Sequence, residues 1–188
     1  MHRCDCSRHA LLNRRSILTG LASIGATPML AFAEPAEPTA AEPSAAEDER
    51  FMRIAITEAK RGDFPFGAVI VRDGRILTRG RNLGRRNDDP TAHGEMVAIR
   101  RCIARHGSRI MRGSTLYTSG EPCAMCMGAI LWSHFGRLVY AASAEQLATK
   151  IDQIMVPSRE LATKTPFAPI AIKGGVLADE AMSLFAKK

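Results

Sequence analysis

Apolar positions along the chain follow two kinds of spacing, which predict alternating helices and strands. Between residues 51 and 59 they recur with helical spacing, whereas shorter runs rich in β-branched residues predict strands. The predicted strands are 67–71, 75–78, 116–118, 138–141 and 170–172, and further helices are predicted at 91–106, 122–132 and 178–186. Asp73-Gly74 predicts a hairpin turn between the first two strands. This order predicts an α/β fold with a sheet covered by helices.

The first third of the chain has the pattern of an export signal. Arg14 and Arg15 precede an apolar run, 17–33, which ends in the A-x-A pattern of Ala31-Phe32-Ala33. We therefore expect a twin-arginine signal over 1–33, cleavage after Ala33 and a periplasmic location. At about 17 residues the run is at the lower limit for crossing a bilayer, so no permanent membrane anchor is expected. The alternative is a buried amphipathic helix in which the arginine pair is incidental.

A linker and one globular domain are predicted after the signal. Residues 34–46, EPAEPTAAEPSAA, contain no large apolar side chain and are expected to form a semi-extended linker. The domain is placed at 47–188, because the composition of the chain, 46% apolar and 24% charged, is that of a globular protein. The formal net charge of +7 permits anionic partners but does not establish nucleic-acid binding.

Two short motifs contain residues suited to binding zinc. His93 lies two residues before Glu95, and Pro122 is followed by Cys123 and Cys126, which have the spacing of metal ligands. A catalytic zinc ion takes three protein ligands and keeps its fourth position for water. A helix N-terminus also favours the thiolate form of cysteine. We therefore predict that Zn²⁺ is held by His93, Cys123 and Cys126.

Glu95 is predicted to be an acid–base group rather than a fourth ligand. Two residues apart on a helix, His93 and Glu95 point in different directions, so they are not expected to bind the same ion. A carboxylate beside a zinc-activated water can take its proton, and can then give that proton to a leaving group. With an amidine-like ring carbon as the target, this chemistry is hydrolytic deamination with release of ammonia.

The two motifs together resemble a known family. Residues 89–96, DPTAHGEM, and 120–126, GEPCAMC, are similar to the cytidine/deoxycytidylate deaminase superfamily, in the branch of bacterial guanine deaminases and tRNA adenosine deaminases. The resemblance covers roughly residues 50–188. It implies a three-layer α/β/α sandwich with a mixed five-stranded sheet, a zinc cofactor and a homodimer. Gly94 departs from the pattern, because the family usually has Ala there.

The resemblance also implies two substrate contacts and leaves the substrate open. Asn82 matches a family position whose side-chain amide contacts the base or sugar, and Asp152 matches an acidic contact position in a divergent segment, 143–168. Each has a simpler interpretation, a turn residue for Asn82 and a solvated helix face for Asp152. Residues 66–69 and Trp132 resemble guanine deaminases, whereas residues 136–140 and 175–180 resemble tRNA adenosine deaminases at least as well.

Export favours a small-molecule substrate, since tRNA is modified in the cytosol. We expect a nucleobase or nucleoside, guanine first. One alternative is a cytosolic tRNA adenosine deaminase whose N-terminus has been misinterpreted. Its nucleic-acid partner would suit a basic cluster that comprises Arg79, Arg81, Arg85 and Arg86. The other alternative is a non-catalytic structural zinc protein, which would need a fourth protein ligand.

Overall fold

The computed structural model describes residues 43–185, so the predicted signal and most of the predicted linker lie outside the described residues. The first described helix, α1 (Ala45–Ala59), begins two residues before the expected domain start. Ser44 caps it: the Ser44 hydroxyl accepts from the Glu47 amide, and the Glu47 carboxylate accepts from the Ser44 amide, both at 3.2 Å. This capping box explains the earlier start, because it satisfies amide groups that a helix end leaves free.

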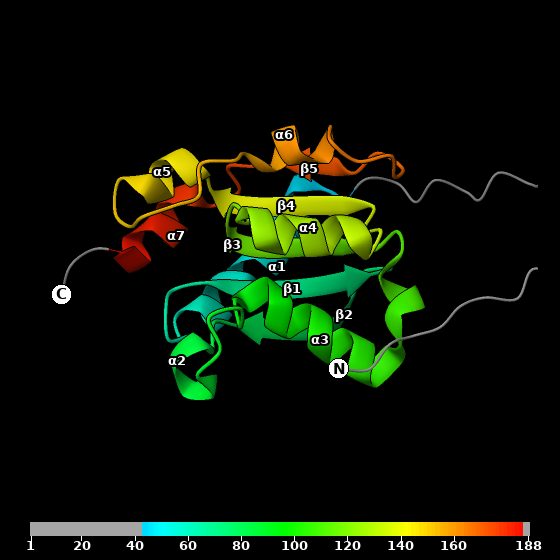
Figure 1. Ribbon diagram of the computed structural model, residues 1–188, viewed down its shortest axis with the longest axis horizontal. Helices are drawn as coiled ribbons and strands as arrows, with labels where there is room; N and C mark the ends of the chain where they lie inside the picture. Colours follow the sequence, from blue (N-terminus) through cyan, green and yellow to red (C-terminus); the bar gives the residue numbers. More distant parts are fainter. Residues whose placement is uncertain (1–42, 186–188) are drawn as a thin grey trace, which may run out of the picture. The chain divides into compact units, whose positions relative to one another are not determined.

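A mixed five-stranded sheet lies at the centre of the domain and confirms the predicted fold class (Figure 1). Its strand order is β2-β1-β3-β4-β5. The β2–β1 and β1–β3 pairs are antiparallel, whereas β3–β4 and β4–β5 are parallel. The strands are β1 (Gly67–Arg72), β2 (Arg75–Arg81), β3 (Thr115–Gly120), β4 (Arg137–Ala142) and β5 (Ala171–Lys173).

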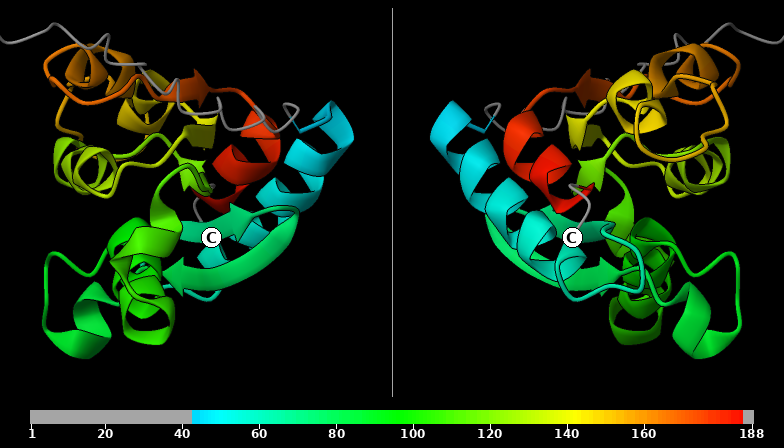
Figure 2. Two further views of the ribbon diagram at one scale, coloured as in Figure 1. Left: turned by 90° about the vertical axis from the view of Figure 1, so that its right-hand side faces the viewer. Right: turned by 90° about the vertical axis from the view of Figure 1, so that its left-hand side faces the viewer.

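Helices cover both faces of the sheet and complete three layers (Figures 1 and 2). Alternate strand residues divide the core. Ile70, Leu116 and Leu138 pack with α3 and α4, whereas their neighbours in the chain pack with α1 and α7. The remaining helices are α2 (Gly84–Asn87), α3 (Gly94–His106), α4 (Ala124–Trp132), α5 (Ala144–Ala148), α6 (Ser158–Ala162) and α7 (Ala178–Met182), with 3₁₀ turns at Ser108–Met111 and Ser183–Phe185.

Two helices begin two or three residues later than the sequence predicts. Helix α3 begins at Gly94 rather than at 91, and α4 begins at Ala124 rather than at 122. His93 and Cys123 are the N-cap residues of these helices and have extended backbone, with ψ of 160° and 166°. The short helix α2 was not expected in its polar loop. Within residues 43–185, no helix combines the length and the apolar character needed to cross a membrane.

A buried ion cluster ties α1 to the sheet at the end where β4 begins. The Asp48 carboxylate accepts from both terminal nitrogens of Arg137, at 2.7 and 2.8 Å, and from Lys173 Nζ at 2.7 Å. The Tyr117 hydroxyl donates to it at 3.0 Å. Burial alone would raise the pKa of Asp48, but these donors outweigh it and lower the pKa to about 2. The carboxylate thus stays ionised inside the protein and connects α1 to β3, β4 and β5.

Candidate metal centre

The two predicted motifs meet where β3 ends and where α3 and α4 begin. Cys123 follows the last residue of β3 closely, and both Cys123 and His93 sit at helix N-caps. Helix α3 starts against β1 because residue 94 has no side chain: a Cβ there would lie 3.0 Å from the carbonyl oxygen of Phe66 and 3.1 Å from Gly67 Cα. Gly94 therefore allows a close helix–strand approach, so its effect is on packing against backbone rather than on space beside the ligands.

The structure brings the three predicted ligands together. His93 Nδ1 lies 3.6 Å from Cys123 Sγ and 3.6 Å from Cys126 Sγ, and all three ligand atoms lie within 4.8 Å of one another. One imidazole nitrogen and two sulfur atoms form a donor set suited to zinc. Among the described residues, no further His, Cys, Asp or Glu joins this group. The residues therefore fit a zinc ion with three protein ligands, as expected for an open site.

The local electrostatics favour one thiolate at this centre. The hydrogen bond from Cys126 is the main cause that lowers the pKa of Cys123 to about 4, with His93 contributing and burial opposing. The same contact, together with burial, raises the pKa of Cys126, and the contact with Cys123 raises the pKa of His93. Cys123 is thus prepared as an anionic ligand, whereas Cys126 has to lose a proton before it can bind a metal ion.

Glu95 lies in the first turn of α3 and is 4% exposed. Burial raises the pKa of its carboxyl group above the usual value, and the opposing effects of His93 and the Thr118 hydroxyl are smaller. A carboxyl group in such surroundings exchanges a proton more readily near neutral pH than a solvated one. Glu95 therefore lies outside the three-residue ligand group and beside Cys126, and its acid–base role stays a prediction.

Asn82 is buried, 4% exposed, and its backbone is fixed to the start of β1, since its amide donates to the Phe66 carbonyl at 2.9 Å. Its side-chain oxygen accepts from the Gly84 amide at 3.0 Å, the turn contact of the simpler interpretation. The side-chain nitrogen makes no hydrogen bond within residues 43–185, so it is the group that can donate to a ligand. Both interpretations of Asn82 are therefore compatible with the structure.

No hydrogen bond or ion pair among the described residues connects Asp152 with the ligand group. It follows α5, is exposed, and makes no hydrogen bond or ion pair with the described residues. Its role in substrate binding stays a prediction.

Glu121 is a functional candidate that the sequence interpretation missed. One of its carboxylate oxygens accepts from the Ala144 amide at 2.9 Å and the other from the Ser158 amide at 2.8 Å. The residue is 8% exposed. It therefore joins the starts of α5 and α6 to the loop that carries Cys123. The sequence offered one signal for this role: an acidic residue stands between a buried strand and Pro122, where a buried carboxylate needs hydrogen-bond donors.

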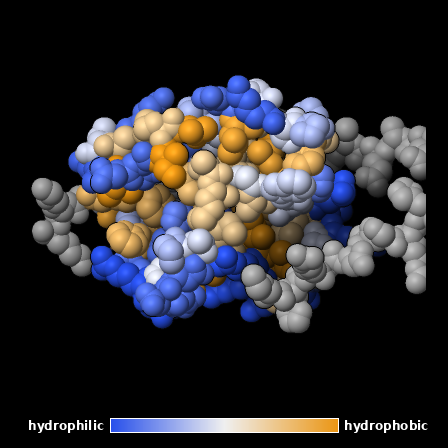
Figure 3. Space-filling model, viewed as in Figure 1, coloured by the Kyte–Doolittle hydropathy of each residue, from blue (hydrophilic) through white to orange (hydrophobic). Residues whose placement is uncertain are grey.

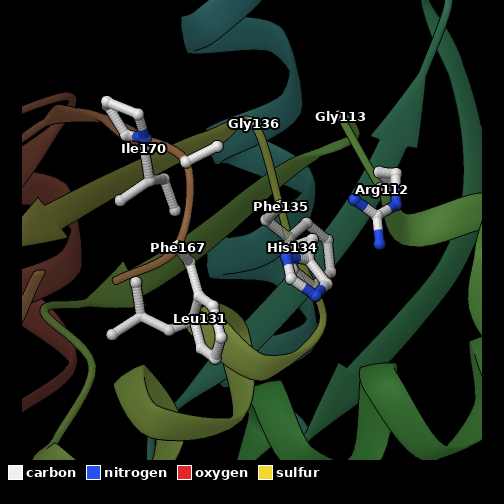
Figure 4. Close-up of a pocket in the computed structure, with 10 residues that line it drawn as sticks. Arg112, Gly113, Leu131, His134, Phe135, Gly136, Phe167 and Ile170 are labelled. Atoms are coloured by element: carbon white, nitrogen blue, oxygen red, sulfur yellow. The ribbon is translucent and has the colours of Figure 1, made fainter. Parts of the chain in front are cut away.

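Two hollows in the described part of the chain lie away from the ligand group. An apolar cavity of about 220 Å³ is lined by residues that include Leu131, His134, Phe135 and Phe167, from the loop after α4 and the segment before β5 (Figure 4). A polar groove of about 440 Å³ runs along β2 and contains Arg79 and Arg81 of the predicted basic cluster. None of the three ligands or Glu95 lines either hollow.

Comparison with known proteins agrees with this site. The model of the family described as "Cytidine and deoxycytidylate deaminase zinc-binding region" matches residues 45–142, more than half of the chain, and that range includes the three ligands and Glu95. The chain therefore belongs to this zinc-binding deaminase family, and the predicted resemblance is confirmed.

Two kinds of deaminase occur among the individual relatives of this chain. Guanine deaminase of Bacillus subtilis (strain 168) is 44% identical over 99 residues, which is 50% of this chain and 64% of that protein. The tRNA-specific adenosine deaminase of Aquifex aeolicus (strain VF5) is 38% identical over 98 residues, 50% of this chain and 65% of that protein. The matches thus span just under two thirds of the length of these relatives.

A solved structure confirms the fold. It comes from a study of A-to-I editing by tRNA:A34 deaminases, is 30% identical to this chain, and superposes with a TM-score of 0.62 over 72% of this chain and 98% of its own. Guanine and tRNA adenosine deaminases are therefore both among the relatives, and the comparisons do not decide between their substrates.

Proposed function

We propose that this protein is a zinc-dependent hydrolytic deaminase of a small nucleobase or nucleoside, with guanine as the first candidate. The observation that carries the proposal is the convergence of His93, Cys123 and Cys126 beside the buried carboxyl group of Glu95. Without a fourth protein ligand among the described residues, the group has the donor set of a catalytic zinc site rather than that of a closed structural one.

Each side chain has a distinct task in this reaction. Bound by the three ligands, zinc supplies a Lewis acid that lowers the pKa of water. Glu95 would accept a proton from the water whose oxygen adds to the ring carbon, and would then donate that proton to the amino group, whose bond to the same carbon breaks as ammonia leaves. The raised pKa of Glu95 favours this transfer. Asn82 offers its side-chain nitrogen as a donor toward an acceptor on the ring. The buried surroundings of Glu95 keep bulk water from competing for the proton.

The choice of a free base is supported by the chain's similarity to guanine deaminase and by the predicted export signal. A protein outside the cytosol would meet free purines and nucleosides rather than tRNA under modification. The test is ammonia release by the zinc-loaded full-length chain with guanine, cytosine, adenine, their nucleosides and related triazines, and with Glu95→Ala as the blank. Release from one free base that disappears in the variant supports the proposal, whereas no release from any small molecule contradicts it.

A second candidate is adenosine deamination in tRNA, which the relatives and the solved structure of the tRNA adenosine deaminase group favour. The assay is conversion of adenosine to inosine in an anticodon stem-loop by the same zinc-loaded protein. Turnover of the stem-loop without turnover of free bases would replace guanine with this substrate. Turnover of neither, with zinc bound in full, would favour a structural zinc protein.

We also propose export by the twin-arginine route, with cleavage after Ala33. The support is the sequence alone, since these residues lie outside the described range. Cell fractionation and N-terminal sequencing test it: the mature protein is expected in the periplasm beginning at Glu34, and Arg14→Lys together with Arg15→Lys is expected to hold it in the cytosol. A full-length cytosolic protein in both cases would contradict the proposal.

A homodimer is the proposed assembly. A band of apolar surface crosses the middle of one face, where α4 lies, with hydrophilic residues on both sides (Figure 3). Trp132 at the end of α4 is 74% exposed, and Ile103 on α3 is 45% exposed. Light scattering is expected to give the mass of a dimer for the wild type and of a monomer for Trp132→Glu, with Arg53→Glu as the control. A monomeric wild type would contradict this assembly.

A further inference from the structure

The polar groove along β2 has the features of a binding site of its own. Strand β2 is an edge strand, and the groove runs beside it with a volume of about 440 Å³. Four arginines line it, Arg79 and Arg81 from β2 and Arg101 and Arg105 from α3. The only carboxylate among its lining residues is that of Glu58 from α1. The groove therefore carries a positive charge that its own residues do not balance.

Two of the arginines are fixed in place by the protein. Arg81 donates to the buried Glu58 carboxylate at 3.2 Å, while its Nε atom is buried without a hydrogen-bond partner in the described structure. Arg101 donates to the backbone carbonyl of Arg79 at 3.0 Å, which occupies an acceptor on the free edge of the sheet. These contacts hold two guanidinium groups at the groove and leave further N–H donors available on each.

The other two arginines have no partner within residues 43–185. Neither Arg79 nor Arg105 makes a side-chain hydrogen bond or an ion pair there, and both are exposed. Two nearby arginines outside the groove are paired with carboxylates, Arg86 with Asp63 at 2.9 Å and Arg100 with Asp89 at 3.1 Å, whereas Arg75 and Arg85 have no carboxylate partner among the described residues. The groove thus holds two unpaired guanidinium groups, those of Arg79 and Arg105, within one hollow of about 440 Å³. Such a concentration of like charge is unfavourable unless an anion accompanies it.

We propose that this groove binds a phosphate-bearing anion, in the form of a compact molecule with one or two phosphate groups. Guanidinium groups bind phosphate with two parallel hydrogen bonds, a geometry that ammonium groups do not offer. The limited volume of the groove, about 440 Å³, and the pairing of Arg86 and Arg100 beside it favour a compact ligand over an extended nucleic-acid backbone. The groove shares no lining residue with the metal centre, so this inference is independent of the proposed deaminase activity.

Calorimetric titration of the full-length protein with fructose 1,6-bisphosphate tests the proposal, because this probe carries two phosphates and no base that could enter a nucleobase site. The double variant Arg79→Ala/Arg105→Ala is expected to weaken binding about tenfold or more, since two free guanidinium groups are removed. Arg79→Lys/Arg105→Lys is expected to bind with an intermediate affinity, because it keeps the charge and loses the paired donors. Arg53→Ala on α1 removes a charge outside the groove and is the matched control.

The outcomes separate the possible sources of phosphate. A parallel titration with a single-stranded RNA 12-mer is expected to show weaker binding than the bisphosphate. Tight RNA binding that both groove variants lose, without binding of the bisphosphate, would overturn the compact-ligand proposal in favour of a polymer. Equal affinity of the bisphosphate for wild type, the double alanine variant and Arg53→Ala would overturn the site itself. Unchanged melting temperatures of the variants show that any loss of binding does not come from unfolding.

Discussion

The two ends of the sheet both contain buried polar groups, but the charges are balanced by neighbouring residues at one end and not at the other. At the end where β4 begins, Asp48 is matched by Arg137 and Lys173, and the cluster is complete within the protein. At the other end, Glu95 is buried among ligand groups and has no basic partner other than His93 among the described residues. The first arrangement stabilises the fold by itself. The second is not matched by charges among the described residues, as expected of a site that could hold a metal ion.

This contrast is reflected in the contacts that each end makes. The Asp48 cluster connects one helix with three strands, with Asp48 fully buried and Arg137 9% exposed, while Lys173 reaches it from the surface. The ligand end instead joins the N-termini of α3 and α4 with the segment that Glu121 holds. We expect substitutions at the first end to change stability more than chemistry, and substitutions at the second end to do the reverse.

The largest expected effect is that of Glu95→Ala at the ligand end. Loss of the acid–base group is expected to lower kcat about 10²–10⁴-fold, the usual contribution of such groups. Since the substitution removes a buried carboxyl group with a raised pKa, the melting temperature is expected to stay the same or to rise. Ammonia release and thermal unfolding measure the two properties. A large loss of stability with little loss of turnover would reverse the comparison between the two ends.

Asp48→Asn is the counterpart at the other end. It removes the carboxylate that Arg137 and Lys173 contact, and removing one member of a buried pair costs about 3–5 kcal/mol in the free energy of unfolding. Zinc content and kcat of the folded fraction are expected to stay near wild-type values. Urea unfolding is the measurement, with Glu49→Gln as the control, because the Glu49–Arg53 pair is exposed and worth well under about 1 kcal/mol. A stable Asp48→Asn protein would contradict the assigned role.

Acid should affect the Asp48 cluster over a defined pH range. The pKa of Asp48 is about 2 in the folded protein and 3.8 as a reference value, so its contribution to stability is complete above about pH 4. That contribution is lost as the pH falls from about 4 to about 2, where the unfolded state binds the extra proton. The free energy of unfolding measured across this range should fall more steeply for wild type than for Asp48→Asn. Parallel slopes would show that other carboxyl groups dominate.

The smallest expected effect is that of Glu121→Gln, which sharpens the comparison within the ligand end. The amide keeps one acceptor oxygen and loses the other, so one of the bonds to Ala144 and Ser158 is lost at a cost of about 1 kcal/mol. Hydrogen exchange is expected to speed up in α5 and α6 while α3 keeps its protection. Glu145→Gln, at an exposed position, is the control. Unchanged exchange in both helices would show that Glu121 does not hold this segment.

Sequence spacing was enough to predict the strands and the Cys-x-x-Cys pair, because both signals are local, whereas the structure brings His93 to that pair from 30 residues away. Alternating and continuous apolar runs reflect which faces of a strand are buried, and a Cys-x-x-Cys pair places two sulfur atoms together whatever surrounds them. Helix starts were less accurate, because an N-cap residue is defined by its backbone conformation and not by its hydrophobicity. The basic cluster of four arginines could be named from the sequence, but only the structure shows that it is divided, with Arg79 and Arg81 at a groove and Arg86 paired with Asp63.

By itself, the sequence determined the order of the strands and of the longer helices, the α/β class, the family and the chemical nature of the metal centre, since these depend on short-range patterns and on residue types. Only the tertiary structure decided which distant residues meet. Asp48 finds Arg137 and Lys173, Glu121 finds Ala144 and Ser158, and arginines of β2 and α3 share a groove. The reason is that strand order and helix packing bring together residues far apart in the chain, and no local pattern records those pairings.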